Sequence, residues 1–108
     1  MKKLIVAAAS GALLLISSYG MAANIEAGKK KAGEVCAACH GQDGNSPAPA
    51  FPKLAGQHAD YLEKSLSEYK SGVRKDPIMA GMAAPLSKED IENLAAYFAT
   101  QPGLKTKY

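Results

Sequence analysis

The chain has 108 residues, of which 47% are apolar and 21% are charged, and its formal net charge is +3. This length allows one small domain, and the charge is too small to argue for binding to nucleic acid or to an anionic membrane. A domain of this size buries only about 60% of its unfolded surface, so the composition leaves room for a large flat cofactor that adds apolar volume.

Residues 1–22 have the three-part layout of a secretory signal peptide. A basic start precedes an apolar run at residues 4–16, and small residues that suit a signal peptidase follow. The apolar run is short for a membrane span, which needs about 20 residues, so an uncleaved anchor is the weaker alternative. We expect cleavage after Ala22, or one residue later. Residues 23–108 would then form one domain without stable membrane insertion, with a net charge of +1 because two lysines leave with the leader.

Three helices are predicted along the chain, and no segment shows the alternating pattern of a strand. The first, at residues 26–37, has a weak signal because small residues dominate it. The second, at residues 58–71, places apolar side chains at i, i+4 and i+7 with Tyr61 beside them, and Gly72 suits the position after its end. This apolar face consists of Leu62, Leu66 and Tyr69.

The last helix has the clearest pattern. Ser87 can cap its start, the acidic residues that follow suit the positive end of the helix dipole, and Pro102 with Gly103 ends it. Two stretches rich in Gly and Pro, residues 41–57 and 72–86, are expected to be irregular, and loops this long are usually functional in so small a domain. The predicted fold class is all-α. The apolar stripe of the last helix consists of Ile91, Leu94, Ala95 and Phe98.

Both cysteines of the chain lie in one motif, VCAACH, which ends at His40. A thiol–disulfide redox pair normally follows a strand in an α/β fold, and no strand is predicted here. A structural zinc site needs four ligands; Cys36, Cys39 and the adjacent His40 cannot easily share one metal, and His58 is the one further histidine. Both interpretations stay open as weaker alternatives.

The third interpretation is covalent attachment of haem, for which C-x-x-C-H is the signature. Two thiols three residues apart on a helical turn can each add to a haem vinyl group. The histidine that follows can then point its imidazole at the iron, and the small residues between the cysteines let the backbone lie close to the ring. The secretory leader agrees, because such proteins are typically assembled outside the cytoplasm. We therefore predict one haem c, bound covalently through Cys36 and Cys39.

The sequence also resembles a known family. Four stretches carry the resemblance, in the order CAACHGQDGNSPAP, FPKLAGQ, PIMAGMAAPLS and DIENLAAYFA. Together they are similar to the class I c-type cytochromes, and most closely to one half of the tandem two-domain di-haem cytochromes c of bacterial respiration. The resemblance implies a small class I cytochrome c fold, with three or more helices and long loops wrapped around one covalently attached haem. A single CxxCH motif makes residues 23–108 look like a single-haem, one-domain member.

The resemblance further implies the ligands of the haem iron. His40 would be the proximal ligand, and its Nδ1 would donate a hydrogen bond to the carbonyl oxygen of Pro52. The sulfur of Met79 would be the second axial ligand. Met82 is the alternative and is otherwise expected to pack in the core. His58 is a weaker rival, because it opens the middle helix.

The family pattern also places a crossing of the first and last helices at Gly28, Leu94 and Tyr97. Partner proteins are expected to dock on small apolar loops beside the haem edge, at residues 47–50 on one side and at residues 80 and 83–85 on the other. Basic residues would surround this rim: Lys53, Lys64, Arg74 and Lys75.

The expected function is one-electron transfer in the periplasm, without catalysis. With both axial positions filled, no iron site is open for oxygen or peroxide chemistry. The expected partners are a quinol-oxidising complex and a terminal oxidase or reductase. Two alternatives remain: a haem sensor or small haem enzyme in which Met79 leaves the iron, and an electron-transfer subunit of a larger oxidoreductase. The resemblance implies a weak absorption band at ~695 nm in the oxidised protein, here called the methionine band.

Overall fold

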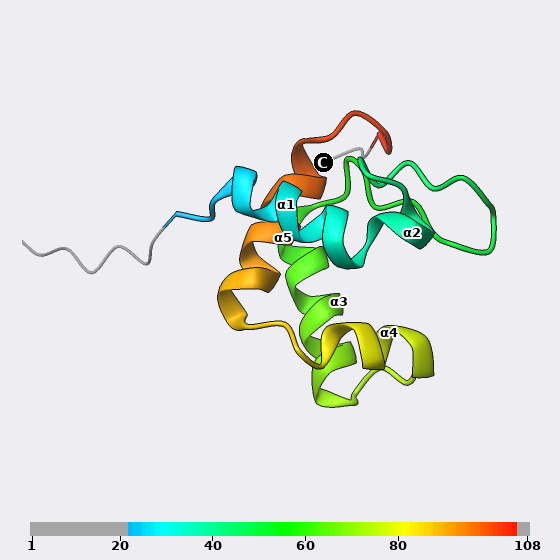
Figure 1. Ribbon diagram of the computed structural model, residues 1–108, viewed down its shortest axis with the longest axis vertical. Helices are drawn as coiled ribbons and strands as arrows, with labels where there is room; N and C mark the ends of the chain where they lie inside the picture. The colour runs from blue at the N-terminus through cyan, green and yellow to red at the C-terminus, as the bar shows by residue number, and fades with distance from the viewer. Residues whose placement is uncertain (1–21, 106–108) are drawn as a thin grey trace, which may run out of the picture.

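The computed structural model describes residues 22–105, so nearly all of the predicted signal peptide lies outside the described residues. The helices of this part of the chain are α1 (Ile25–Val35), α2 (Ala37–His40), α3 (Ala59–Ser71), α4 (Pro77–Ala83) and α5 (Lys88–Thr100) (Figure 1). No strand occurs within residues 22–105, and the all-α prediction is confirmed. No helix in this range has both the length and the apolar character that crossing a bilayer requires.

Helices α1 and α5 cross in close contact, as the family resemblance implies. A Cβ atom at Gly28 would lie 2.1 Å from the backbone oxygen of Asn93 and 2.9 Å from the Cβ of Tyr97. Leu94, next to Asn93 on α5, is completely buried. The two backbones can approach this closely because glycine has no side chain.

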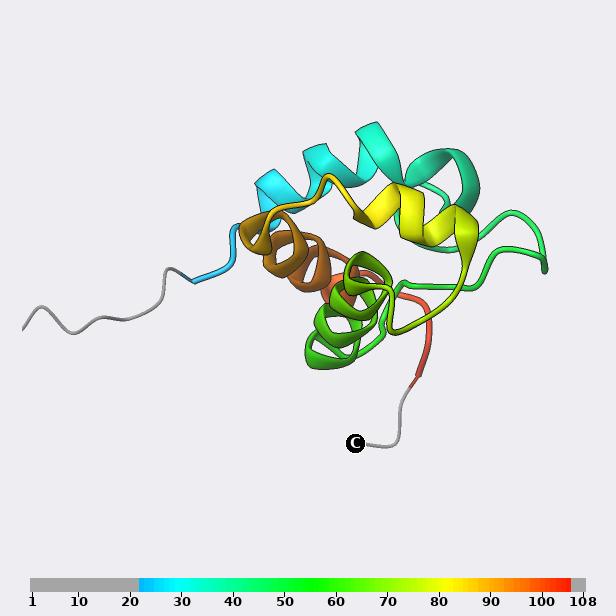
Figure 2. The same cartoon turned by 90° about the horizontal axis from the view of Figure 1, so that it is seen from below.

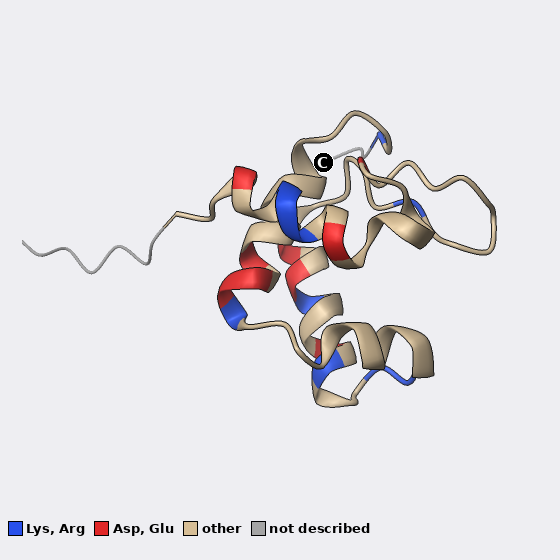
Figure 3. Cartoon of the chain, in the orientation of Figure 1, with Lys and Arg blue, Asp and Glu red and all other residues tan. Residues whose placement is uncertain are grey.

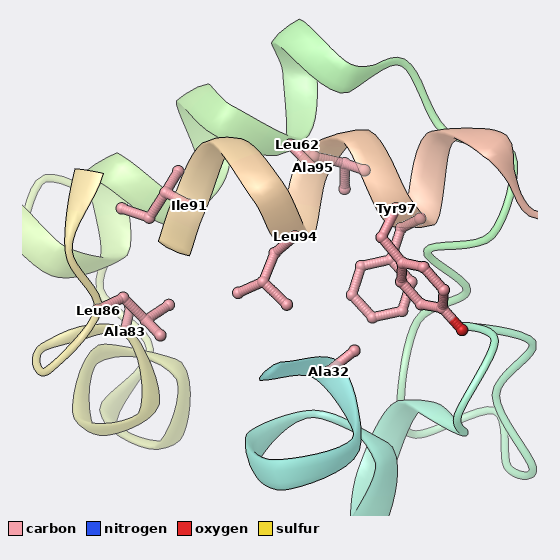
Figure 4. Close-up of a cluster of buried hydrophobic side chains, with 9 residues drawn as sticks. Ala32, Leu62, Ala83, Leu86, Ile91, Leu94, Ala95 and Tyr97 are labelled. Atoms are coloured by element: carbon pink, nitrogen blue, oxygen red, sulfur yellow. The ribbon is translucent and has the colours of Figure 1, made fainter. Parts of the chain in front are cut away.

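Helix α5 lies between α1 and α3 and forms the centre of the hydrophobic core (Figures 2 and 4). The predicted stripe of α5 is buried throughout, and Leu62 of α3 is buried against it, with Leu66 and Tyr69 half-buried beside the core. Tyr61, predicted beside this face, is 49% exposed and does not join the core. It precedes Leu62 by one residue and is therefore turned about 100° away from it. The core residues are Ala32, Leu62, Ala83, Leu86, Ile91, Leu94, Ala95, Tyr97 and Phe98.

Capping explains where the last helix begins. The hydroxyl of Ser87 accepts from the backbone N–H of Asp90 at 3.0 Å, and the Asp90 carboxylate accepts from the N–H of Ser87 at 3.0 Å. This reciprocal capping box confirms the predicted cap. The bond from the Ser87 N–H favours the ionised carboxylate, so it holds the pKa of Asp90 below its usual value.

The stretch 72–86 is not irregular throughout, which corrects the sequence prediction. Gly72 ends α3 in the left-handed conformation, as expected, but helix α4 then forms at Pro77–Ala83. The Asp76 side chain accepts from the N–H groups of Ile78 and Met79, and Pro77 stands at the first helical turn, where proline is well tolerated. The proline that seemed to indicate a loop therefore starts a helix.

Candidate functional site

The CxxCH motif lies on a separate helical turn. Helix α1 ends at Val35, two residues before the predicted end, and Cys36 closes it by donating from its N–H to the oxygen of Ala32 at 2.9 Å. The chain then bends into α2, where the N–H of His40 donates to the oxygen of Cys36 at 3.0 Å. Cys36 and Cys39 thus span a single helical turn, and both are half-buried. Such spacing suits two attachments along one edge of a flat ring.

The environment of Cys36 does not favour thiol redox chemistry. Burial raises the pKa of the Cys36 thiol to about 11. A redox-active CxxC pair needs the opposite shift, because the thiolate is the reacting species. Within residues 22–105, no three side chains among His, Cys, Asp and Glu gather closely enough to hold a bare metal ion.

His40 is 7% exposed, and its Nδ1 atom lies 2.8 Å from the carbonyl oxygen of Pro52. A carbonyl oxygen can only accept, so Nδ1 carries the hydrogen of this bond. In the neutral imidazole, the lone pair then lies on Nε2, which is the form that binds a metal ion. The structure therefore contains the predicted contact between these two residues.

Hydrogen bonds across the fold hold the loop that carries Pro52. Gly44 accepts from the N–H groups of Leu54 and Ala55 at 2.8 and 3.2 Å, which closes the loop at its base. The hydroxyl of Tyr97 donates to the oxygen of Gln42 at 2.7 Å and so ties the loop to α5. Sequence reasoning assigned Tyr97 a packing role and missed this bond, although a tyrosine near the end of an apolar helix face could have suggested a polar partner.

A second connection joins the loop to the chain after α5. The side-chain amide of Asn45 donates to Asp43 at 2.9 Å and to the carbonyl oxygen of Pro102 at 2.8 Å. The bond from the Asn45 side chain lowers the pKa of the Asp43 carboxyl. This connection was also missed. The sequence predicted an irregular stretch at residues 41–57, but it did not indicate which distant carbonyl a side chain of that stretch would reach.

Helix α4 carries the two methionines, and they differ in exposure. Met79 is half-buried, whereas Met82 is 41% exposed, so the prediction that Met82 packs in the core is wrong. The reason is helical geometry. Met79 and the buried Ala83 are four residues apart and share a face, while Met82 lies about 100° away from Ala83. His58, the weaker rival, is exposed at the N-cap of α3, where its side chain makes no capping bond.

The candidate ligands come from separate parts of the fold. In Figure 1, α2 and the adjoining loop 41–57 lie in the upper right part of the view, and α4 lies in the lower right.

Helix α4 has no charged residue, whereas α1, α3 and α5 carry charges of both signs (Figure 3). A surface hollow of about 340 Å³ is present in residues 46–53, but neither the cysteines, His40 nor the methionines line it.

Comparison with known proteins gives a consistent result. The family model described as "Cytochrome c" matches residues 25–102. Cytochrome c4 of Stutzerimonas stutzeri is 50% identical over 103 residues, which cover 84% of this chain and 49% of the relative. Cytochrome c-554(548) of Halomonas halodenitrificans is 47% identical over 83 residues, which cover 74% of this chain and 99% of the relative.

A solved structure shows the same likeness in three dimensions. The crystal structure of reduced recombinant cytochrome c4 from Pseudomonas stutzeri matches with a TM-score of 0.71 and 51% identity, over 77% of this chain and 48% of that one. The chain spans about half the length of the cytochrome c4 relatives and nearly all of cytochrome c-554(548).

Proposed function

The chain belongs to the cytochrome c family, and from this premise we propose that it is a one-electron carrier whose haem iron is held by His40 and Met79. Its CxxCH motif binds one haem c covalently. Cys36 and Cys39 are the attachment residues in this proposal, and the haem supplies a reversible one-electron change of its iron. All other roles belong to side chains of the polypeptide.

The position of His40 carries the proposal. This side chain is buried, it follows the second cysteine directly, and its Nδ1 is engaged by Pro52 at 2.8 Å. The bond fixes the orientation of the ring and leaves Nε2 as the free nitrogen. A histidine that served only the core would not need to follow two cysteines on one helical turn.

Met79 is proposed as the second ligand on two grounds. Its side chain shares the inner face of α4 with Ala83, and Asp76 fixes the start of that helix by accepting from the Met79 N–H at 3.0 Å. Met82 instead is directed toward solvent. With an imidazole and a thioether as its ligands, the haem iron would have a higher reduction potential than with an anionic ligand such as a thiolate, and no coordination position would be open. This arrangement suits a carrier and does not suit a catalyst.

The proposed setting is the periplasm, and the proposed partners are redox proteins such as a quinol-oxidising complex and a terminal oxidase or reductase. The predicted leader supports this location. Relatives from several bacteria are named as cytochromes, which supports transfer of electrons between proteins. A carrier must bind and release its partners quickly, so a small docking surface is expected.

The predicted docking rim needs three corrections. Ala83 is completely buried in the core and cannot belong to it. Arg74 donates to the hydroxyl of Ser65 at 3.0 Å and lies over the ring of Tyr69, so its guanidinium is already engaged. The revised rim contains the exposed part of residues 47–50, the outer face of α4 and residues 84–85, with the exposed cations Lys53 and Lys75 beside it. Lys64, whose ammonium pairs with Glu68 on α3, is left out of the revised rim.

Two measurements on protein purified from its native compartment test the proposal. The intact mass should exceed that of the polypeptide by one haem, and the oxidised protein should show the methionine band. A mass equal to that of the polypeptide alone would show that no cofactor is bound covalently. If the band is absent and the reduced protein binds carbon monoxide readily, a sensor or small haem enzyme becomes the better assignment.

A further inference from the structure

Helix α4, which carries the proposed sulfur ligand, is weakly anchored by apolar packing. It has only seven residues, and a helix this short is marginal unless other parts of the fold support it. Within residues 22–105, its only buried residue is Ala83, and the helix it packs against most extensively is α3. Its position must therefore depend strongly on the polar contacts at its two ends.

The start of α4 has two such supports. Asp76 caps it, and Arg74, two residues earlier, is attached to α3 through Ser65 and the ring of Tyr69. The end of α4 has a different problem. The last carbonyl oxygens of a helix have no partner within the helix, and they carry its partial negative charge.

Lys70, in the last turn of α3, provides a donor for the carbonyl oxygen at the C-cap of α4 and for a second oxygen just beyond it. Its Nζ donates to the oxygen of Ala84 at 2.9 Å and to the oxygen of Leu86 at 2.5 Å. One ammonium group thus joins α3 to the segment that leaves α4. Leu86 is itself buried in the core, so the bonded segment has little freedom to move.

We infer that Lys70 is a positioning residue for Met79: it clamps the exit of α4 to α3 and so holds the sulfur at the iron. This inference rests on the proposed ligation by Met79. The mechanical link is the helix ladder, because Ala84 donates to Ala80 at 3.0 Å and Ala80 donates to Asp76 at 2.8 Å. A continuous ladder moves as a unit, so release of Ala84 also releases Met79.

Three variants of the haem-loaded protein test this role. Lys70→Met keeps the length of the stem and removes the donors, and Lys70→Arg restores donors. Lys64→Met is the matched control: it removes another cation from α3, whose side chain is 75% exposed and pairs with Glu68. The probe is imidazole at a pH where it is uncharged, because it binds ferric iron only after the methionine leaves.

Lys70→Met is expected to bind imidazole about ten-fold more tightly than the wild type, from the loss of hydrogen bonds to a charged group. Lys70→Arg should lie close to the wild type, and Lys64→Met should be unchanged. Wild-type imidazole affinity in Lys70→Met overturns the inference, even if that variant melts earlier, because a merely structural role would lower the melting temperature alone. An equal gain in Lys64→Met also overturns it.

Hydrogen exchange separates this inference from the proposed ligation. If the wild type lacks the methionine band, the ligation proposal fails, and unchanged exchange of the α4 amides in Lys70→Met shows that the clamp fails as well. If the band is present and imidazole binding does not respond, only the role of Lys70 is wrong. If Lys70→Met does not accumulate with haem, the same measurements are made on Lys70→Gln, which retains an amide donor on a shorter stem. The expected gain in imidazole affinity is then smaller.

Discussion

At the scale of single residues, local helical geometry distinguishes the two methionines that are candidates for the proposed second iron ligand. Met79 and Met82 are three residues apart in a segment without charge, and sequence alone cannot tell which one points inward until the start of the helix is known. The cap at Asp76 fixes that start, and Ala83 then defines the inner face. Family resemblance favoured Met79, and the half-buried position of its side chain gives this choice a physical reason.

The first prediction follows from this difference. Met79→Ala should abolish the methionine band and lower the reduction potential, because the thioether is replaced by water or a stronger-field ligand. Met82→Ala should leave both unchanged, since it truncates an exposed side chain. Absorption spectroscopy and redox titration measure the two effects. A band that survives in Met79→Ala and disappears in Met82→Ala would reverse the assignment.

At the scale of elements, the helices depend on caps at their starts and on one glycine at a crossing. The residue pattern predicted the cap of α5, and the family resemblance implied the glycine. Ser87 was predicted as a cap from its position before acidic residues, and the structure adds the reciprocal bond from Asp90. Gly28 was predicted as a contact position. The start of α4 was missed, because a Pro and two Gly residues near it resembled a loop.

The second prediction concerns the crossing of α1 and α5. Gly28→Val should lower the free energy of unfolding by about 1–3 kcal/mol or more, because its first carbon would collide with the backbone of Asn93. The control is Gly81→Ala in α4, where the added carbon meets no atom within 4 Å apart from its chain neighbours and the backbone of its own helix. That change should be neutral or stabilise by up to about 1 kcal/mol. Chemical denaturation of both loaded variants gives the comparison, and equal stability would contradict the packing argument.

The third prediction is the pH dependence of the α5 cap. The pKa of Asp90 is lowered in the folded state, chiefly by the bond from the Ser87 N–H, so the ionised carboxylate stabilises the fold. This contribution is complete above the usual value of 3.8 and is lost as the pH falls through the lower folded pKa. Asp90→Asn should therefore be less stable than the wild type at neutral pH, by up to about 1 kcal/mol after solvent screening.

The deficit of Asp90→Asn should shrink progressively below pH 3.8. Denaturation curves across that range measure it. Glu89→Gln, an exposed change in the same helical turn, is the control for the loss of one negative charge near the helix start. A deficit in Asp90→Asn that stays constant into acid would show that charge is not the source of the stabilisation.

At the scale of the whole molecule, the charge-free α4 beside exposed lysines predicts how redox reagents approach. Reversing both Lys53 and Lys75 to Glu should slow oxidation of the reduced protein by ferricyanide, an anion, by about two- to ten-fold at low ionic strength. The difference should vanish at high salt. Lys88→Glu is the control, since that lysine lies on α5 and pairs with Glu92. If the stopped-flow rate is the same in the double variant and the wild type, these lysines do not belong to the rim.

The division between what could and could not be predicted also becomes clear at this scale. Periodicity was sufficient for the helices that build the core, whereas the contact between His40 and Pro52 was implied by the family resemblance. The bonds from Tyr97 to Gln42 and from Asn45 to Pro102 join residues more than fifty positions apart. Such bonds depend on how complete elements meet, and that information is absent from any local pattern. The bonds from Lys70 to Ala84 and Leu86 were not predicted either, because α4 itself was not predicted.

The anchoring of Asn24 has a consequence for the order of events during export. Its backbone N–H donates to the side chain of Asn93 at 2.7 Å, and its own side chain caps α1. The bond predicted to be cut after Ala22 lies only two residues from this fixed point. A peptidase that needs several extended residues in its cleft cannot reach the bond once α1 has closed on α5. Removal of the leader should therefore come before folding is complete, and a precursor that folds first should resist its own maturation.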